Sequence, residues 1–261
     1  MQPLIEKSSE YLRQWIERNG VDRREVARVV EGVDVSARRE VPALPDGQEP
    51  EIFIPGLTAS AWWDSGRFPW LAELEASTAD ITREFLAAGG FGGGGVVSQP
   101  SELTDQGRWT ALYLYCIGKA YSRNLDLCPA TTRALGAVPG VTAADGGMCY
   151  FSIMEPRTHV SAHTGYTNAH LRCHLGLVVP GECRLRVGGE VREWEQGKAF
   201  VFDDSFEHEA WNDAESGRAV LLFDLWHPDL TDVEVRALAH MMGVWRKLLA
   251  RSFWSAEMAR S

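Results

Sequence analysis

The chain has 261 residues, of which 45% are hydrophobic and 24% are charged, and its formal net charge is −10. This composition predicts one globular domain, or one domain with a helical annex. The acidic balance argues against a nucleic-acid-binding protein, which would present a basic face. No apolar run reaches the roughly 20 residues that span a bilayer, and the N-terminus has no signal-peptide core. We therefore expect no membrane partner, a cytoplasmic location and, since no CxxC pair occurs, reduced cysteines.

Helices and loops are predicted for the first hundred residues. The expected elements are two helices within residues 4–31, divided near Gly20; a loop at 41–55 with a short strand at 51–54; and a helix at 69–88, ended by the glycine-rich stretch 89–95. That stretch lacks the Lys-Ser/Thr of a phosphate-binding loop and does not lead from a strand into a helix. A mobile loop is the simpler interpretation, and a lid over a site is the alternative.

Short β-rich segments follow from Trp109 onward. The predicted strands are 110–117, 149–154, 160–163, 171–179, 183–187, 190–193, 198–202 and 219–226, with a helix near 130–135. This spacing indicates a sandwich or barrel, and a jelly roll fits best. A last helix is expected at 232–249, with Thr231 as its cap. The predicted organisation is a helical extension at 1–50, a β-rich domain at 51–231 and a C-terminal helix of the same domain at 232–261. Both helical parts would pack outside a mainly β core.

Two histidines and an arginine carry the strongest chemical pattern. His163 and His208 lie 45 residues apart, and Arg218 follows the second histidine by ten positions. Non-haem iron sites usually combine two histidines with one carboxylate on one face of the metal. The position two after the first histidine, where that carboxylate normally sits, is Gly165. The pattern predicts an iron site with an open position, beside an arginine that can hold a dicarboxylate cosubstrate.

Strand parity provides a test of this site, because alternate residues point to opposite faces. Arg172 and His174 leave one face of their predicted strand, and the other face is apolar. Ser152 and Arg218 can likewise point inward, and Asp224 shares the face of Arg218. A barrel interior holding these side chains would combine metal ligands with cationic anchors. The economical assignment gives Arg218 to the cosubstrate and Arg172 to an acidic group of the substrate.

Other interpretations stay open. Chance pairs are easy among seven histidines, and four are expected to be structural or packed: His159, His170, His227 and His240. Asp203 and Asp204 could ligate a metal, but a turn before a strand is rich in Asp for backbone reasons. A cupin-like jelly roll that binds a small ligand or metal without turnover would share the fold. Such a protein would not need Arg218 and Ser152 beside two histidines.

Four stretches around these residues have a specific pattern. They are Phe151–Pro156, Leu171-Arg-Cys-His-Leu-Gly-Leu-Val-Val-Pro180, Phe202-Asp-Asp-Ser-Phe-Glu-His-Glu209 and Leu225–Thr231. They resemble the aspartyl/asparaginyl β-hydroxylase family of Fe(II)/2-oxoglutarate dioxygenases. The resemblance covers about residues 52–231 and implies a double-stranded β-helix whose iron is held by two histidines without a carboxylate.

The resemblance also implies roles for the site residues. It makes His163 and His208 the catalytic iron ligands, and Arg172 the group that holds a substrate carboxylate. The 2-oxoglutarate-binding residues would be Ser152, His174 and Arg218. The position left open by Gly165 can then be filled by water.

Departures from the family pattern flank the strand that carries His163, the first predicted iron ligand, or lie in the loop leading to it. Tyr166 stands where Pro is usual and His170 where Arg is usual, and Ala162 and Arg157 replace Pro and Gly. The iron site is thus expected to be intact and the substrate wall changed, with Tyr166 and His170 as substrate-binding residues.

The expected activity is Fe(II)- and 2-oxoglutarate-dependent hydroxylation with O₂. The favoured target is a carbon β to a carboxylate or amide in an amino acid, peptide or amino-acid-derived metabolite. Halogenation or desaturation at the same iron site, or ligand binding without catalysis, are the alternatives. The oligomeric state is not predicted.

Overall fold

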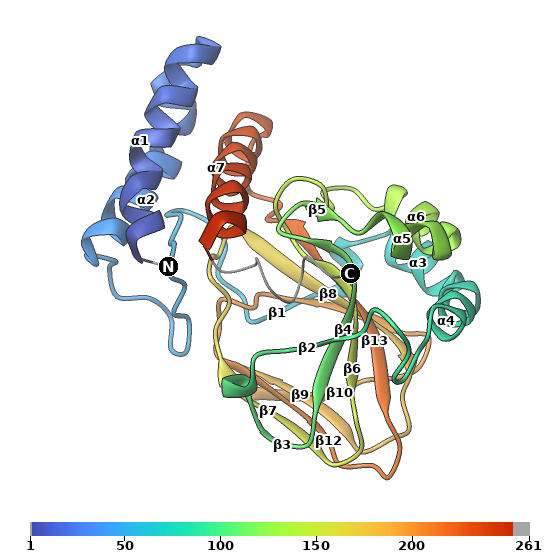
Figure 1. The fold of residues 1–261 in the computed structure, drawn as a ribbon. Helices are drawn as coiled ribbons and strands as arrows, with labels where there is room; N and C mark the ends of the chain where they lie inside the picture. The colour runs from blue at the N-terminus through green and yellow to red at the C-terminus, as the bar shows by residue number, and fades with distance from the viewer. Residues whose placement is uncertain (1, 253–261) are drawn as a thin grey trace.

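Two antiparallel sheets form the centre of the computed structural model, which describes residues 2–252 (Figure 1). The first sheet has the order β1 (Trp62–Trp63), β11 (Ala199–Phe202), β8 (His170–Val178), β13 (Arg218–Trp226), β6 (Cys149–Met154), β4 (Trp109–Cys116) and β2 (Val97–Ser98), with β5 (Lys119–Ala120) paired to β4. The second has the order β10 (Glu190–Glu193), β9 (Cys183–Val187), β12 (His208–Asn212), β7 (Thr158–His163) and β3 (Thr104–Gln106).

From β6 to β13 the chain passes repeatedly between the two sheets. Strands β6, β8, β11 and β13 lie in the first sheet, and β7, β9, β10 and β12 lie in the second. Each sheet therefore joins strands from both ends of this segment, since β13 pairs with β6 and β12 pairs with β7. This topology is a double-stranded β-helix, or jelly roll. The predicted mainly β fold with helices outside the core is confirmed.

The helices form two groups (Figure 1). One group, beside one end of the sheets, consists of α1 (Gln2–Asn19), α2 (Ala27–Arg38) and α7 (Asp232–Ser252). The other, packed on the first sheet, consists of α3 (Leu71–Ala76), α4 (Thr78–Ala87), α5 (Ser122–Leu127) and α6 (Pro129–Gly136). Short 3₁₀ segments occur at Arg23–Val26, Ser65–Arg67 and Ser101–Leu103. Within residues 2–252, no helix has the length and apolar character to cross a membrane.

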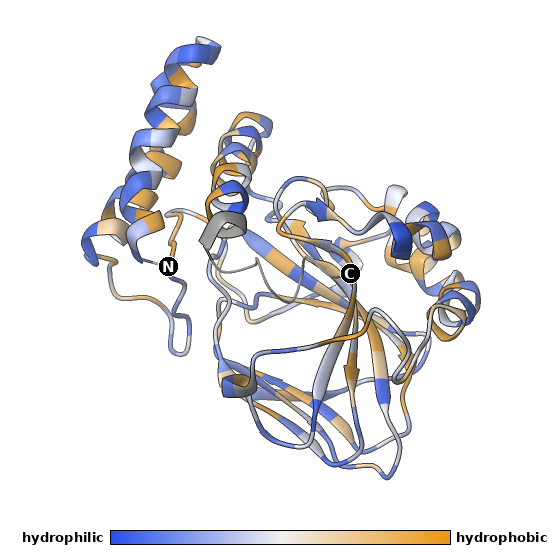
Figure 2. Cartoon of the chain, in the orientation of Figure 1, coloured by the Kyte–Doolittle hydropathy of each residue, from blue (hydrophilic) through white to orange (hydrophobic). Residues whose placement is uncertain are grey.

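Strand alternation separates an outer core from the barrel interior. In β8, Leu171, Cys173 and Leu175 belong to the apolar cluster that includes residues of α3, α4 and α6. Arg172 and His174, between them, line a cavity inside the barrel. Figure 2 shows hydrophobic and hydrophilic residues following one another along the strands and around α1 and α2. The parity that the sequence predicted for β8 is therefore present in the fold.

The N-terminal helices and α7 share one apolar cluster, which also includes Ile52, Ala169 and Trp226. A capping box begins α7: Thr231 N–H donates to Glu234 Oε2 at 2.8 Å, and Glu234 N–H donates to Thr231 Oγ1 at 3.4 Å. The predicted cap at Thr231 is thus confirmed. The domain boundaries at residues 50 and 231 stay predictions, and residues 253–261 lie outside the described part of the chain.

The single helix predicted at 69–88 is wrong, because α3 and α4 are separate helices that meet at Ser77. The Ser77 hydroxyl donates to the Glu73 carbonyl at 3.1 Å, and the Thr78 hydroxyl donates to the Glu75 carbonyl at 2.6 Å. Hydroxyl groups that bond nearby backbone carbonyls compete with regular helix geometry. The apolar stripe therefore continues across two helices instead of one.

The strand predicted at 51–54 is also wrong. Ile52 forms only an isolated bridge with Thr167, and the Ile54 N–H donates to the Asn168 side chain at 2.7 Å. A side-chain amide thus takes the place of a strand ladder. The second predicted helix also continues further than expected, to Arg38.

Candidate active site

His163 and His208 meet on neighbouring strands of the second sheet. His163 ends β7, His208 begins β12, and the two are register partners. Their ring centroids lie 4.2 Å apart. Both line the cavity inside the barrel, and so do four other residues predicted from the sequence: Ser152, Arg172, His174 and Arg218. The fold therefore brings together the predicted ligands and anchors from both sheets.

The backbone sets the tautomer of both histidines. Nδ1 of His163 lies 2.7 Å from the Ser161 carbonyl oxygen, and Nδ1 of His208 lies 2.9 Å from that of Phe206. A carbonyl oxygen only accepts, so each Nδ1 carries the proton and each Nε2 keeps a lone pair. Burial lowers the pKa of both imidazoles, which favours the neutral form. Neutral imidazoles whose other nitrogen is fixed in this way are suited to bind a metal.

Among residues 2–252, no third His, Cys, Asp or Glu side chain is placed with the pair to hold a metal. A Cβ atom on Gly165 would lie 2.4 Å from Cγ of Asp204, so no carboxylate side chain fits at position 165. The geometry agrees with a site of two protein ligands, in which further positions are left for small ligands.

Arg218 is a buried cation without an anionic partner among residues 2–252. It is 2% exposed, and its Nη1 donates to the carbonyl oxygen and Oγ of Ser152 at 3.0 and 3.2 Å. Its guanidinium carbon lies 4.4 Å from the ring centroid of Trp194, and Nε has no hydrogen-bond partner in the described structure. Burial lowers the pKa of Arg218 to about 10. An anionic ligand would relieve this unfavourable burial.

Two more donors line the same cavity. The indole Nε1 of Trp194 donates to Nδ1 of His174 at 3.3 Å, so the proton of His174 lies on Nε2. That Nε2 is buried without a partner in the described part of the chain. The Oγ of Ser152 accepts from Trp109 Nε1 at 3.0 Å and from Arg218, which leaves its own proton to donate. Arg218, Ser152 and His174 therefore present unused donors, as a carboxylate-bearing cosubstrate requires.

Arg172 also lines the cavity, but it already has two anionic partners. Its Nη1 lies 2.8 Å from Oδ2 of Asp204, and its Nε lies 2.9 Å from Oδ1 of Asp224. Burial by itself would lower the pKa of Arg172, but the two aspartates raise it well above its usual range. Burial raises the pKa of Asp204 to about 6, although Arg172 opposes that rise. Arg172 and its aspartates thus form a buried ion-pair cluster at the edge of the cavity.

Tyr166 and His170 lie beyond Arg172 and are not among the residues that line the cavity. His170 is 2% exposed and is the register partner of Trp226. The Tyr166 hydroxyl lies 3.3 Å from Nδ1 of His170 and also contacts Met242 of α7. Burial lowers the pKa of His170 to about 4. Their contact with a substrate stays a prediction, since α7 covers Tyr166 in this structure.

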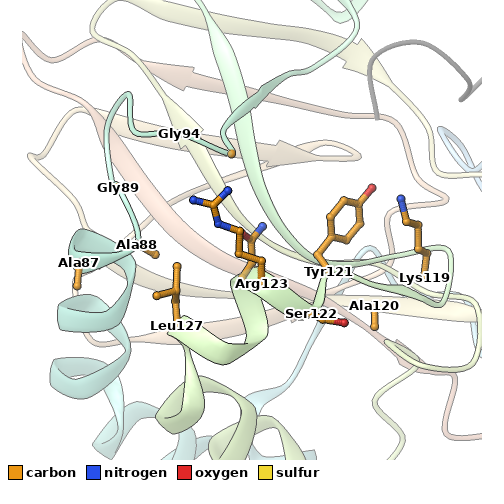
Figure 3. A pocket seen from close by; sticks show the side chains of 12 residues that line it. Ala87, Ala88, Gly89, Gly94, Lys119, Ala120, Tyr121, Ser122, Arg123 and Leu127 are labelled. Atoms are coloured by element: carbon orange, nitrogen blue, oxygen red, sulfur yellow. The ribbon is translucent and has the colours of Figure 1, made fainter. Parts of the chain in front are cut away.

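A larger pocket, of about 660 Å³, lies elsewhere (Figure 3). Lys119, Tyr121 and Arg123 line it together with the glycine-rich stretch that follows α4. A Cβ atom on Gly95 would touch Leu112, which belongs to the outer core under the helices. No residue predicted for the iron site lines this pocket. The glycine-rich stretch is therefore placed away from the histidines and not over them.

Sequence reasoning missed several partners of the site. The aromatic anchors Trp109 and Trp194 were among ten tryptophans that fit a core role equally well. Asp203 does form a turn, accepting from Ser205 N–H at 2.9 Å, and Asp204 pairs with Arg172. The inward parity of Asp224 was a usable signal for its pairing with Arg172.

The jelly-roll topology and the paired histidines define a double-stranded β-helix protein with a candidate two-histidine metal site. Residues 75–228 match the family model of aspartyl/asparaginyl β-hydroxylase. The human aspartyl/asparaginyl β-hydroxylase is 40% identical over 192 residues, which cover 71% of this chain and 25% of that protein. The ornithine lipid ester-linked acyl 2-hydroxylase of Rhizobium tropici is 37% identical over 183 residues, covering 64% and 60%. The chain belongs to the aspartyl/asparaginyl β-hydroxylase family.

The similarity covers only part of the full-length relatives. The chain spans about a quarter of the length of the human and mouse β-hydroxylases. Among solved structures, a prolyl-4-hydroxylase from Pseudomonas putida matches with a TM-score of 0.36 and 15% identity, over 65% of this chain and 90% of that one.

Proposed function

We propose that the chain is an Fe(II)- and 2-oxoglutarate-dependent oxygenase that hydroxylates an unactivated carbon. The favoured target is a carbon β to a carboxylate or amide in an amino acid, peptide or amino-acid-derived metabolite. One observation carries the proposal: beside two histidines with free Nε2 lone pairs, Arg218 and His174 keep buried donors without partners. A metal and a dicarboxylate would satisfy both halves of this arrangement.

In this proposal, His163 and His208 hold Fe(II) through Nε2. Arg218, Ser152 and His174 hold the carboxylates of 2-oxoglutarate through charge-assisted and neutral hydrogen bonds. With the cosubstrate and O₂ present, iron supplies the oxidising chemistry that no side chain can provide. The protein fixes the geometry, because the carbonyl groups of Ser161 and Phe206 hold both imidazole rings in place.

The walls of the cavity would keep the reaction dry. Apolar and aromatic side chains line it between the two sheets, among them Trp109, Leu185, Phe202 and Leu222. Exclusion of water strengthens the electrostatic contacts made by Arg218 and prevents side reactions of activated oxygen. Arg172, which lines the same cavity, would meet a polar group of the substrate.

The names of the relatives support hydroxylation but not one substrate. One relative is named for aspartyl and asparaginyl groups and another for the acyl chain of an ornithine lipid. The family therefore includes members named for amino-acid and for acyl substrates. Tyr166 and His170, which replace the residues usual in the family, are the positions at which we expect this chain to differ in substrate.

The test is succinate release under air from protein loaded anaerobically with Fe(II) and 2-oxoglutarate, with and without a panel of amino acids and aspartyl or asparaginyl peptides. Anaerobic Fe(II) binding is measured on the same samples. We expect His163→Ala and His208→Ala to lose both iron binding and succinate release, and His240→Ala on α7 to keep them. If His208→Ala still released succinate in response to a substrate, His208 would not be an iron ligand. A product that gains chlorine, or loses two hydrogens, would instead indicate halogenation or desaturation.

A further inference from the structure

The pocket beside the glycine-rich stretch is large enough for a ligand of its own. Its volume of about 660 Å³ lies within the range of roughly 300–1,000 Å³ that is common for small-molecule sites. The end of α4, the glycine-rich stretch, β5 and α5 form its walls. It shares no lining residue with the barrel cavity, so a ligand here would not compete for His163 or His208.

The charged side chains that line this pocket are both cationic. They are Lys119 and Arg123, and no Asp or Glu accompanies them, although the chain has 36 acidic and 26 basic residues. Glu84 and Asp126 are the acidic residues nearest in sequence to the lining residues, but neither lines the pocket. Glu84 instead accepts from two backbone N–H groups in the first turn of α6, at 2.6 and 2.8 Å. The pocket is therefore locally positive in a protein of net charge −10.

Tyr121 adds a hydrogen-bond donor to the cationic side of the pocket. Nζ of Lys119 lies 4.7 Å from its ring centroid, and Tyr121 is only 7% exposed. Its hydroxyl group is buried and has no hydrogen-bond partner in the described part of the chain. Burial raises the pKa of Tyr121 to about 12, so this hydroxyl keeps its proton at neutral pH and can donate. A buried polar group without a partner indicates a place for a ligand atom or a water molecule.

The other side of the pocket is apolar. Figure 3 shows the lining residues in order from right to left: Lys119, Tyr121, Arg123, Leu127, Ala88 and Ala87. Leu127 is 48% exposed, and Leu86, beside Ala87 in α4, is 53% exposed. These are two of the four large hydrophobic side chains exposed in the described structure, and Phe91 of the glycine-rich stretch is a third. Exposed apolar side chains that gather beside polar groups are typical of a binding site.

We propose that this pocket binds one single-chain amphiphile with an anionic head group, such as a fatty acid. The head group would accept hydrogen bonds from Arg123 and Tyr121, and the planar guanidinium matches a carboxylate. The alkyl chain would lie on Leu127 and continue over Ala88 at the end of α4. Arg123 and Leu127 are four residues apart on α5, so their side chains are neighbours on one face of that helix. Binding here needs neither iron nor 2-oxoglutarate and thus goes beyond the proposed function.

Two other kinds of ligand fit less well. A small inorganic anion could pair with Arg123 but would leave the apolar side of the pocket in contact with water. A cationic amphiphile would cover that side but place its charge beside Lys119 and Arg123, where like charges repel. An anionic amphiphile matches both sides, because burial of its chain and pairing of its head group are each favourable.

Titration calorimetry of the full chain with dodecanoate, below the concentration at which it forms micelles, tests the proposal. Dodecyltrimethylammonium has the same alkyl chain with the opposite charge, and acetate has the same head group without the chain. We expect one dodecanoate to bind per chain, at least about tenfold more tightly than either comparison ligand.

Substitutions in the pocket show where dodecanoate binds. Arg123→Gln and Leu127→Gln should each weaken its binding by about tenfold, and Tyr121→Phe by about threefold. The matched controls are Arg133→Gln on α6 and Val191→Gln on β10, an exposed arginine and an exposed hydrophobic residue that do not line the pocket. Both controls should bind dodecanoate as the unmodified protein does. Thermal unfolding of each variant checks that the fold is kept.

Three results would overturn the proposal. The first is absent dodecanoate binding, or equal binding of dodecyltrimethylammonium. The second is unchanged affinity in both Arg123→Gln and Leu127→Gln. The third is competition with Fe(II) and 2-oxoglutarate under anaerobic conditions, which would place dodecanoate in the barrel cavity; we expect none. Flotation with phosphatidylglycerol vesicles is measured in parallel. Vesicle binding that is lost in Leu127→Gln, without binding of dodecanoate, would assign this surface to a membrane and reject a single bound amphiphile.

Discussion

The two arginines of the barrel cavity differ in their partners. Arg218 is 2% exposed and has no anionic partner in the described structure, and its guanidinium contacts Ser152, Met154 and Trp194. Arg172 contacts two aspartates within 2.9 Å. Burial lowers the pKa of Arg218 to about 10, whereas the aspartates raise that of Arg172 above its usual range. A buried charge without a partner indicates a place for a ligand, and a buried charge with partners first indicates a structural element.

This comparison gives the two arginines different expected effects on stability and binding. Loss of Arg172 would leave two carboxylates unpaired inside the protein. Loss of Arg218 would remove an unpaired charge and, with it, the proposed anchor for a cosubstrate.

Replacement of Arg172 with methionine should lower the free energy of unfolding by about 3–5 kcal/mol, because it leaves the buried carboxylates of Asp204 and Asp224 without a cationic partner. Urea unfolding of the ligand-free protein measures the change. Arg184→Met is the control, since its pair with Asp213 is exposed and screened, and it should cost no more than about 1 kcal/mol. A loss for Arg172→Met as small as that of the control would mean that Asp204 and Asp224 do not depend on it.

Addition of 2-oxoglutarate at 100 times its Kd, with a divalent metal, should raise the free energy of unfolding by about 2.7 kcal/mol. The same concentration should give little stabilisation of Arg218→Met, because the carboxylate loses its guanidinium partner. Thermal unfolding with and without the cosubstrate measures both effects. Equal stabilisation of the two proteins would contradict the assignment of Arg218 as the anchor.

Acidification should destabilise the protein in part through His170. Burial lowers the pKa of His170 to about 4 from a usual value near 6.5, so the unfolded chain takes up a proton that the folded chain refuses. The free energy of unfolding is therefore unaffected by His170 above pH 6.5 and falls as the pH is lowered toward 4. At pH 5, the loss that comes from this residue is about 2 kcal/mol. Urea unfolding at pH 7 and pH 5 measures the slope, which should be smaller in His170→Asn. An unchanged slope would show that His170 is not held neutral.

Without cosubstrate, Arg218→Met should raise the free energy of unfolding by about 1 kcal/mol, since it removes a buried charge that lacks a counter-ion. Lost stacking on Trp194 offsets part of the gain. Urea unfolding in ligand-free buffer measures the effect, with Arg184→Met again as the control. A loss of several kcal/mol would show that Arg218 supports the ligand-free fold, as Arg172 does.

Strand parity explains why much of the interior could be predicted from the sequence. Alternation in β8 separated Arg172 and His174 from the leucines and Cys173 on the other face, and the fold keeps this division. The strand that begins at His208 was not predicted, although the histidine itself was. The residues around the start of this strand, Asp203 to Glu209, are mostly acidic and polar. They lack the alternation of apolar and polar residues that indicates a strand.

Contacts between residues far apart in the sequence could not be predicted. The partners of Arg172 are 32 and 52 positions away along the chain and lie on different elements, so no local pattern joins them. The division of α3 from α4 depends on two hydroxyl bonds at Ser77 and Thr78, which helix periodicity does not reveal. Covering of Tyr166 by α7 likewise follows from tertiary packing and not from the sequence around either residue.

The contact between the N-terminal helices and α7 has a consequence for synthesis of the protein. Arg28 pairs with Glu234 across 206 residues of sequence, and Ser8 accepts a hydrogen bond from Trp245 at 2.8 Å. On the ribosome, the apolar stripe of α1, which includes Leu12 and Ile16, is made long before the helix that covers it. Helix α2 follows directly and packs on part of that stripe, but the part that α7 covers stays exposed until α7 emerges, and exposed apolar surface of this kind favours aggregation of an incomplete chain.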